Sequence, residues 1–353
     1  MSYKIGSFNV RNLSLGAGRK RDLARIAKII KQFDIVALQE VLSNGKILEG
    51  VSSKNPSVAA KAYEYSLRRY LGDNWDMCWL DPQTASKWYP YIGNDSRGEG
   101  YAFLWRKDKF QCPVNDKGKE VRPRIIHQYR VNSSKGELRL IRDPGYGRFQ
   151  LVNMPNLEIR LITVHLVYTK PSPENLLKDI AHGVATLRKN EFKVLARNIY
   201  TSISDDRRDV KPIVPYTIIL GDYNLNLSES GAGYPHVRKI LYIDSDKNII
   251  NPVIDVQSDK KYVLHTKQSM LSTVNRDADG YASNFDHFTY DQRAKNIVSS
   301  PPMRLDVIED GDFKKYKEEV SDHIPIMLEI DFKHGGLRWI DTKWLIIKKK
   351  NMK

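Results

Sequence analysis

Asp222 and Asn224 lie two residues apart directly behind an apolar run, and this spacing suggests chemistry. Residues 217–220 predict a strand that is buried on both faces, and Gly221 allows the backbone a close turn behind it. Because side chains alternate along a strand, Asp222 and Asn224 point to the same side. A surface turn explains the pair equally well, since both residue types favour turns. This stretch alone leaves both interpretations open.

Other expected strands of the chain end in side chains of the same kinds. Each one alone is usually a cap or a turn, but if the strand ends meet at one edge, they form a cluster with net negative charge and two imidazoles. Carboxylates do not gather in one crevice without a cation between them. The residues are Asn9 (SFNVR), Glu40 (VALQEV), His165 (TVHL), Asp286 (NFDH), and Asp322 with His323 (SDHIP).

The ligand atoms in such a cluster are carboxylate and amide oxygens with little sulfur, which suits Mg²⁺ or Mn²⁺ better than Zn²⁺. A hard cation neutralises a phosphate oxygen while a general base activates water, so the site predicts phosphoester hydrolysis. In this interpretation Asp222 and Asn224 hold the nucleophilic water and a phosphate oxygen.

The elements that must position these residues alternate between short apolar strands and a few helices. The sequence predicts a four-layered α/β sandwich, in which two packed mixed β-sheets are flanked by helices. No phosphate-binding glycine motif follows a strand, which disfavours nucleotide-cofactor folds. Strands are expected at 3–10, 35–38, 101–106, 148–153, 157–164, 217–220, 284–290 and 323–330, and helices at 20–33, 57–71 and 174–204.

The length of 353 residues fits one large domain, which we expect at 1–332. Residues 107–147 are polar, basic and hairpin-like and predict an insertion, and 333–353 form a basic C-terminal extension. The two cysteines, Cys78 and Cys112, make neither a disulfide framework nor a metal motif.

The chain carries 57 basic and 42 acidic residues, a formal net charge of +15. This charge favours a polyanionic partner, either nucleic acid or an anionic membrane surface, although a basic proteome would give the same excess. The first residues lack the apolar core of a signal peptide, and no apolar run is long enough to cross a bilayer. We therefore expect a cytoplasmic protein, with export by another route left open.

The ordered set SFNVR, VALQEV, EGYAFLWR, TVHL, LGDYNLN, NFDHF and SDHIPI resembles the endonuclease/exonuclease/phosphatase superfamily, and its DNase I-like branch most of all. The resemblance runs from residue 3 to residue 330. It implies that Glu40 is the main metal ligand, helped by Asn9 and Asp322. Mg²⁺ or Mn²⁺ is the implied cofactor, with Ca²⁺ as an additional structural ion.

The resemblance also implies roles for the remaining residues. His165 would be one catalytic imidazole, held by Glu99 of EGYAF, and His323 the other, oriented by Asp286. Asp222 would orient or deprotonate water, and Asn224 would bind a phosphate oxygen. Arg148 in YGRFQ would contact phosphate, although the proline usual two residues later is Gln150 here.

Fewer features of the sequence indicate the substrate than indicate the site. The charge and the motif set favour an endonuclease acting on DNA or RNA, with DNA preferred and a monomeric state expected. The arginine that follows the QE motif in DNase I and enters the minor groove is absent, with Leu42 in that stretch. A phosphoinositide or sphingomyelin phosphodiesterase is the alternative enzyme, but we find no apolar membrane-docking loop. A catalytically inactive nucleic-acid-binding module is the alternative of another class, and it would require a missing ligand.

Overall fold

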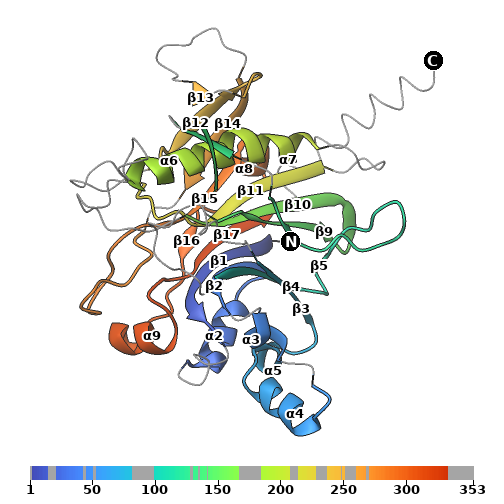
Figure 1. The fold of residues 1–353 in the computed structure, drawn as a ribbon, viewed down its shortest axis with the longest axis vertical. Helices are drawn as coiled ribbons and strands as arrows, with labels where there is room; N and C mark the ends of the chain where they lie inside the picture. Colours follow the sequence, from blue (N-terminus) through green and yellow to red (C-terminus); the bar gives the residue numbers. More distant parts are fainter. Residues whose placement is uncertain are drawn as a thin grey trace.

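A computed structural model describes most of the chain: residues 2–14, 21–42, 45–50, 53–81, 99–127, 130–133, 136–140, 142–166, 184–206, 214–227, 237–247, 249–250, 260–267 and 270–332. Two mixed sheets lie face to face, with helices on both outer sides (Figure 1). This four-layered arrangement confirms the predicted fold class. No helix within these ranges is long and apolar enough to span a membrane.

The first sheet contains the N-terminal strand at its centre. β1 pairs in parallel with β2 and antiparallel with β17, so both ends of the domain meet in one sheet. The strand order is β16 (Met303–Arg304), β17 (Ile326–Asp331), β1 (Ser2–Leu13), β2 (Ile35–Val41), β4 (Gly100–Arg106) and β3 (Trp75–Leu80).

The second sheet is built around the strand that carries the GDYN stretch. That strand, β11, pairs in parallel with β10 and antiparallel with β15. The strand order is β13 (Ile249–Ile250), β12 (Ile240–Asp244), β14 (Lys260–Lys267), β15 (Asp286–Asp291), β11 (Val214–Asp222), β10 (Met154–His165), β9 (Gly145–Leu151) and β5 (Phe110–Gln111), and β6 (Arg124–Ile125) also pairs with β9.

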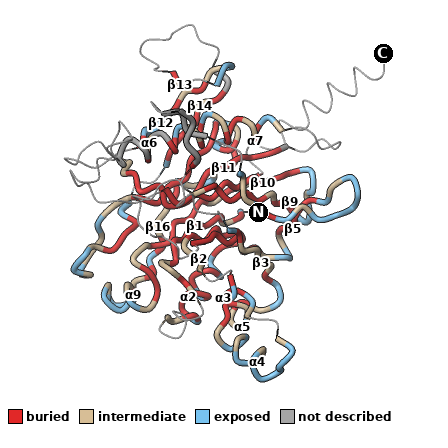
Figure 2. Tube along the Cα trace, in the orientation of Figure 1, coloured by how far each residue is buried: buried red, intermediate tan, exposed pale blue. Residues whose placement is uncertain are grey.

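Alternation along the strands creates three apolar layers. Ile218 and Leu220 of β11 enter the cluster between the two sheets, whereas Ile219 faces the outer helices. Residues 217–220 are therefore buried on both faces, as predicted. Figure 2 shows buried segments concentrated in the paired sheets and exposed ones at the periphery.

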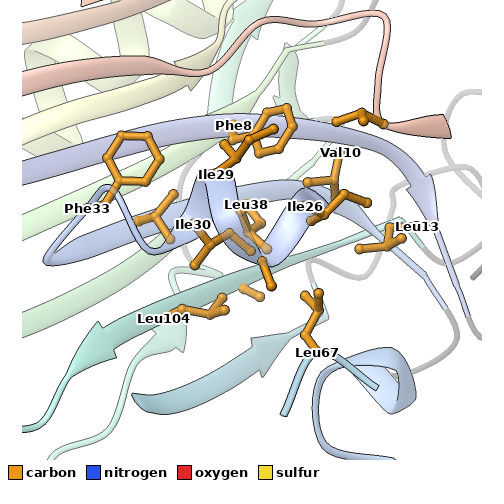
Figure 3. Packing of buried hydrophobic residues seen from close by; sticks show 14 of the residues in the cluster. Phe8, Val10, Leu13, Ile26, Ile29, Ile30, Phe33, Leu38, Leu67 and Leu104 are labelled. Atoms are coloured by element: carbon orange, nitrogen blue, oxygen red, sulfur yellow. The ribbon is translucent and has the colours of Figure 1, made fainter. Parts of the chain in front are cut away.

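Helices cover the outer face of the first sheet. In Figure 3, Ile29 of α2 lies next to Phe8 of the sheet, and Ile26 and Ile30 belong to the same cluster as Leu38, Leu104 and Leu67 of α5. The helices on this side are α2 (Leu23–Ile30), α3 (Lys46–Glu49), α4 (Pro56–Glu64) and α5 (Leu67–Leu71).

One long helical segment covers the second sheet. It consists of α6 (Val184–Val194), the π-helical turn η4 (Leu195–Tyr200) and α7 (Thr201–Asp205). The start of the helix predicted at 174–204 lies outside the described residues, as does the predicted C-terminal extension 333–353. The remaining helices are α8 (Gln292–Lys295), η5 (Glu309–Gly311) and α9 (Phe313–Glu319).

One expectation about the segments needs correction. The single helix predicted at 57–71 is two helices, because Ser66 takes an extended conformation and its hydroxyl donates to the Tyr63 carbonyl, which ends α4. The boundaries of the other helices differ by a few residues from those expected. Residues 107–147 contain the predicted hairpin, β7 (Arg130–Ser133) with β8 (Gly136–Arg139). Within the same segment, β5 and β6 are hydrogen-bonded to β9 of the second sheet, and the insertion stays a prediction.

Candidate active site

Strand register places three predicted residues side by side at one edge of the second sheet. His165 ends β10 opposite Asp222, and Asp222 ends β11 opposite Asp286 at the start of β15. Gly221 makes this possible, because its φ of 143° is unfavourable for other residues and an added Cβ would collide with the Val164 carbonyl oxygen. The polar residues therefore share one edge because their strands are paired neighbours.

A cleft of about 350 Å³ opens where this edge meets the corresponding edge of the first sheet. It gathers most of the site residues predicted from sequence, which come from both sheets and from the loop before β17. The lining residues are Arg11, Asn12, Glu40, His165, Asp222, Asn224, Thr273, Val274, Phe285, Asp322 and His323.

Asp222 lies between the two imidazoles. Its Oδ2 atom is 3.6 Å from His165 Nε2 and 3.5 Å from His323 Nε2, and it accepts a hydrogen bond of 3.1 Å from Asn9 Nδ2. The side chain is almost fully buried. Burial raises the pKa of Asp222, and the two nearby imidazoles only partly oppose this effect. The result is a dehydrated carboxylate with raised basicity, as a general base requires.

His323 has a firm carboxylate partner on its far side. Its Nδ1 atom lies 2.8 Å from Asp286 Oδ2, and that oxygen also accepts a 2.7 Å hydrogen bond from the Ser272 hydroxyl. Burial lowers the pKa of His323, but the carboxylates of Asp286 and Asp222 outweigh it and raise the pKa well above its ordinary value. The cationic imidazolium is therefore favoured at neutral pH, with Nε2–H directed to the cleft.

His165 has a looser arrangement. Its Nδ1 atom is 3.4 Å from Glu99 Oε2, an ion-pair distance that is long for a hydrogen bond. Burial and Arg142 lower the pKa of His165, while Glu99, Asp222 and Glu40 raise it, and the net direction is upward. The predicted Glu99–His165 pair is thus brought together, but a third group competes for the same carboxylate oxygen.

That third group is Arg142, which the sequence analysis did not single out. Its Nη2 atom lies 2.7 Å from Glu99 Oε2, and its Nη1 donates a 3.4 Å hydrogen bond to the His165 carbonyl. A signal was present, because Arg142 has Pro144 two residues later, the spacing that Arg148 lacks.

Arg148 is not brought to the cleft. Its guanidinium forms a bidentate pair with the buried Glu158, with distances of 3.0 and 2.7 Å. Arg160 contacts the same carboxylate at 2.5 Å, so Arg148 belongs to a buried ionic group within the second sheet. In this position its guanidinium does not reach a phosphate bound in the cleft.

Glu40 reaches the cleft through an irregular strand end. It has a left-handed φ of 61°, and the β2 pairing shifts register on both sides of it, as at a β-bulge. Asn9 Nδ2 donates to Glu40 Oε1 at 2.8 Å, and the Asn12 backbone N–H donates to Oε2 at 3.0 Å. These two donors fix the carboxylate while leaving it at the surface of the cleft.

The two asparagines of the site are held by their own contacts. The amide oxygen of Asn9 accepts from the Arg11 backbone N–H at 2.9 Å, so its contacts position Glu40 and Asp222. Asn224 adopts a φ of 48°, and its Nδ2 donates to the Leu166 carbonyl at 2.7 Å. Because an amide nitrogen carries two N–H donors, this bond orients Asn224 without exhausting its donors.

The donor set fits a hard divalent cation. Glu40 and Asp322 present carboxylates to the cleft, with Asp322 Oδ2 3.4 Å from Arg11 Nε. The buried Oδ1 of Asn12 also belongs to a cleft-lining residue and accepts no hydrogen bond from any described group. Such oxygen ligands suit Mg²⁺, Mn²⁺ or Ca²⁺. Within the described residues, a tight Asp222–Asp286–His323 cluster also exists, but the imidazole already bridges its two carboxylates.

The protein has two mixed sheets flanked by helices, and imidazole–carboxylate pairs and acidic residues gather at one edge of these sheets. This combination is that of a class of phosphoric ester hydrolases. A sequence profile of the Endonuclease/Exonuclease/phosphatase family matches residues 6–323, and the chain belongs to this family. Enzymes of the family depend on a divalent metal ion.

Several solved structures are similar to this chain at low sequence identity. Truncated TDP2 from Caenorhabditis elegans is 14% identical, covers 94% of this chain and 97% of its own, and has a TM-score of 0.45. An endonuclease/exonuclease/phosphatase from Bacteroides vulgatus is 12% identical, with 94% and 99% coverage and a TM-score of 0.49. A family protein from Leptotrichia buccalis is 16% identical, with 94% and 100% coverage and a TM-score of 0.47. The search of curated proteins gives no match.

Proposed function

We propose that this protein is a divalent-metal-dependent phosphodiesterase that hydrolyses DNA. One observation carries the proposal: Asp222 lies between the Nε2 atoms of two imidazoles, at 3.6 and 3.5 Å. A buried carboxylate between two N–H donors is suited to hold a water molecule against a phosphorus atom whose oxygens the imidazoles contact.

Each side chain then has a defined task. Asp222 orients the attacking water and takes up its proton, which the raised pKa of this carboxyl favours. His323 donates its Nε2–H to a phosphate oxygen as negative charge develops there, and Asp286 stabilises its cationic form. His165 approaches from the neighbouring strand, and Asn224 supplies an amide N–H donor at the cleft.

Glu40 and Asp322 would hold the divalent cation, with Asn12 Oδ1 as a further oxygen. When bound, this cation supplies charge neutralisation at a phosphate oxygen. Asn9 was expected as a ligand from the resemblance, and its hydrogen bond to Glu40 supports a role in fixing that carboxylate.

The preference for nucleic acid is supported by charge. The chain has a net charge of +15, and Arg11 lies at the mouth of the acidic cleft, where it can meet a phosphate. The preference for DNA within nucleic acids comes from the resemblance of the motif set to DNase I-like enzymes.

A substrate panel tests the proposal. The purified protein is incubated with plasmid DNA, single-stranded DNA, RNA, a phosphoinositide and bis(p-nitrophenyl) phosphate, each with Mg²⁺, Mn²⁺ or EDTA. We expect cleavage of DNA with either metal and none in EDTA. Faster release of a lipid headgroup than of any nucleotide would contradict the DNA preference, and full activity in excess chelator would contradict the metal requirement.

A further inference from the structure

A second and larger cavity, of about 690 Å³, is lined by residues of the helical segment α6–η4 and of β12 and β13 at the edge of the second sheet. Figure 1 shows where these elements lie in the fold. Its wall includes Leu225, the residue after Asn224 of the cleft, so the two cavities share the end of the GDYN stretch. The lining residues are Lys189, Phe192, Lys193, Arg197, Leu225, Val237, Arg238, Leu241, Ile249 and Ile250.

The charged residues of this cavity have one sign. Of the ten lining residues that belong to the described part of the chain, four are cationic and none is acidic. Lys189 and Lys193 are four residues apart on α6, which is about 6 Å along the axis of an α-helix, and Arg197 lies in the π-helical turn that follows. Like charges at the spacing of the two lysines repel each other and disfavour the helix. Arg238 lines the same cavity from the segment before β12, so an anion bound there would be attracted by two elements and would relieve the repulsion between the lysines.

The floor of the cavity is apolar. Phe192, Leu225, Val237 and Leu241 are all buried there, and Phe192 packs against Tyr223 with ring centroids 5.0 Å apart. The volume falls in the range of small-ligand pockets, roughly 300–1,000 Å³. An apolar floor under a cationic rim suits a ligand that carries a flat apolar group on an anionic chain.

We propose that this cavity binds the nucleic acid strand that continues beyond the cleft, with its phosphates along the Lys189–Lys193 row and a base against the apolar floor. The inference rests on the proposed function, because it assumes that the substrate is a nucleic acid. A row of cations favours a strand over a compact anion, and the shared Asn224–Leu225 segment connects this cavity with the cleft.

The test compares two charge-matched variants. Lys189→Glu/Lys193→Glu changes the row, and Lys117→Glu/Lys119→Glu makes the same charge change at exposed residues of a distant turn. Binding of a fluorescent single-stranded oligonucleotide is measured by anisotropy in EDTA at several salt concentrations. We expect the first variant to raise Kd about tenfold or more and to lower the log–log salt slope by about 1.4, or about 0.7 for each lost contact. The control variant should keep the wild-type slope.

Catalysis gives an independent readout. Bis(p-nitrophenyl) phosphate is too short to reach the second cavity, so its kcat/KM should be unchanged in the row variant while that of the oligonucleotide falls. Arg238→Glu, in the segment before β12, should act in the same direction. Equal oligonucleotide affinities for the row variant, the control variant and the wild type would overturn the inference.

Two further experiments distinguish a nucleic acid strand from other ligands of this cavity. If a mononucleotide competes with the oligonucleotide and its own binding is lost in the row variant, the cavity is an effector site. If binding to phosphatidylserine vesicles is lost while oligonucleotide binding persists, the cavity faces a membrane. Either result contradicts the strand proposal. Failure of the proposed function itself is distinguishable, because the wild-type protein would then bind no nucleic acid yet still hydrolyse the small diester.

Discussion

The Nδ1 atom of His323 lies 2.8 Å from Oδ2 of Asp286, a distance at which the ring N–H is shared with a buried carboxylate. Ser272 donates to the same oxygen, so the carboxylate cannot turn away from the ring without losing a second bond. This pair fixes both the orientation and the charge of the imidazole that faces Asp222.

We expect Asp286→Asn to lower the pKa of His323 and to reduce kcat about 10²-fold. The pKa of His323 is raised in the folded protein. The imidazolium is therefore fully present at any pH below the ordinary pKa of histidine, and it is lost only as the pH rises through the raised pKa of the folded protein. The alkaline limb of the pH–rate profile should therefore move to lower pH in the variant. Ser272→Ala is the control and should shift the limb less. An unchanged alkaline limb would show that this pair does not control the profile.

For the other imidazole, we expect a non-additive pair of variants. His165→Ala should reduce kcat about 10²-fold or more, and Glu99→Gln should cost less because it loosens a contact that is already 3.4 Å long. The double variant should be little worse than His165→Ala alone, since residues that act as one unit are not additive. Steady-state kinetics on folded protein measure this, and additive losses would show that Glu99 does not act through His165.

Arg142 and Arg148 provide a matched comparison of two buried arginines. Arg142→Met should lower kcat about 10- to 100-fold, because it removes a group that holds Glu99 and the His165 carbonyl. Arg148→Met should instead lower the free energy of unfolding by about 3 kcal/mol, because Glu158 loses a bidentate partner. Denaturant melts and kcat of the folded fraction separate the two effects. A larger loss of kcat in the Arg148 variant would restore its predicted role in phosphate binding.

Glu40→Gln should weaken metal binding and activity together, because the cleft loses one of its few anionic ligands. Calorimetric titration with Mn²⁺ and the metal dependence of kcat are the measurements. Glu49→Gln, on an exposed side chain paired with Arg68, is the control and should leave both unchanged. Normal Mn²⁺ affinity in the Glu40 variant would place the cation elsewhere.

Gly221→Ala should destabilise the protein by more than about 3 kcal/mol, because a positive φ and a collision with the Val164 carbonyl act together. Gly118→Ala is a suitable comparison, since Gly118 also has a positive φ, of 72°, but has open space around it. It should cost only about 1–2 kcal/mol. Thermal melts of both variants measure the difference, and equal costs would show that the close approach at Gly221 is unimportant.

Much of the site could be predicted because its residues lie at the ends of largely apolar strands. Asp222, His165 and Asp286 were expected at strand ends, and their strands are neighbours in the second sheet. Glu40 was found through its motif, although its left-handed conformation is set by the pairing of β2 on both sides and has no local signal.

The residues that were missed depend on long-range contacts. Arg142 follows the β7–β8 hairpin in a stretch that looked like an insertion, and only the pairing of β9 with β10 brings it to His165. Arg148 was misplaced because strand alternation does not show which face of β9 meets the cleft, and the buried Glu158 lies 10 residues away in sequence. Asp222 and Asn9 are hydrogen-bonded across 213 residues, a contact that no local pattern contains.

The pairing of β1 with β17 has a consequence for how the protein is made. The site takes Asn9 from the first strand and His323 from the loop just before the last one, and Ser321 donates to the Asn9 carbonyl. A chain still emerging from the ribosome therefore lacks one side of the cleft until His323 and the strand after it have been translated. The proposed hydrolytic activity would begin only when closure of the first sheet brings β1 and β17 together.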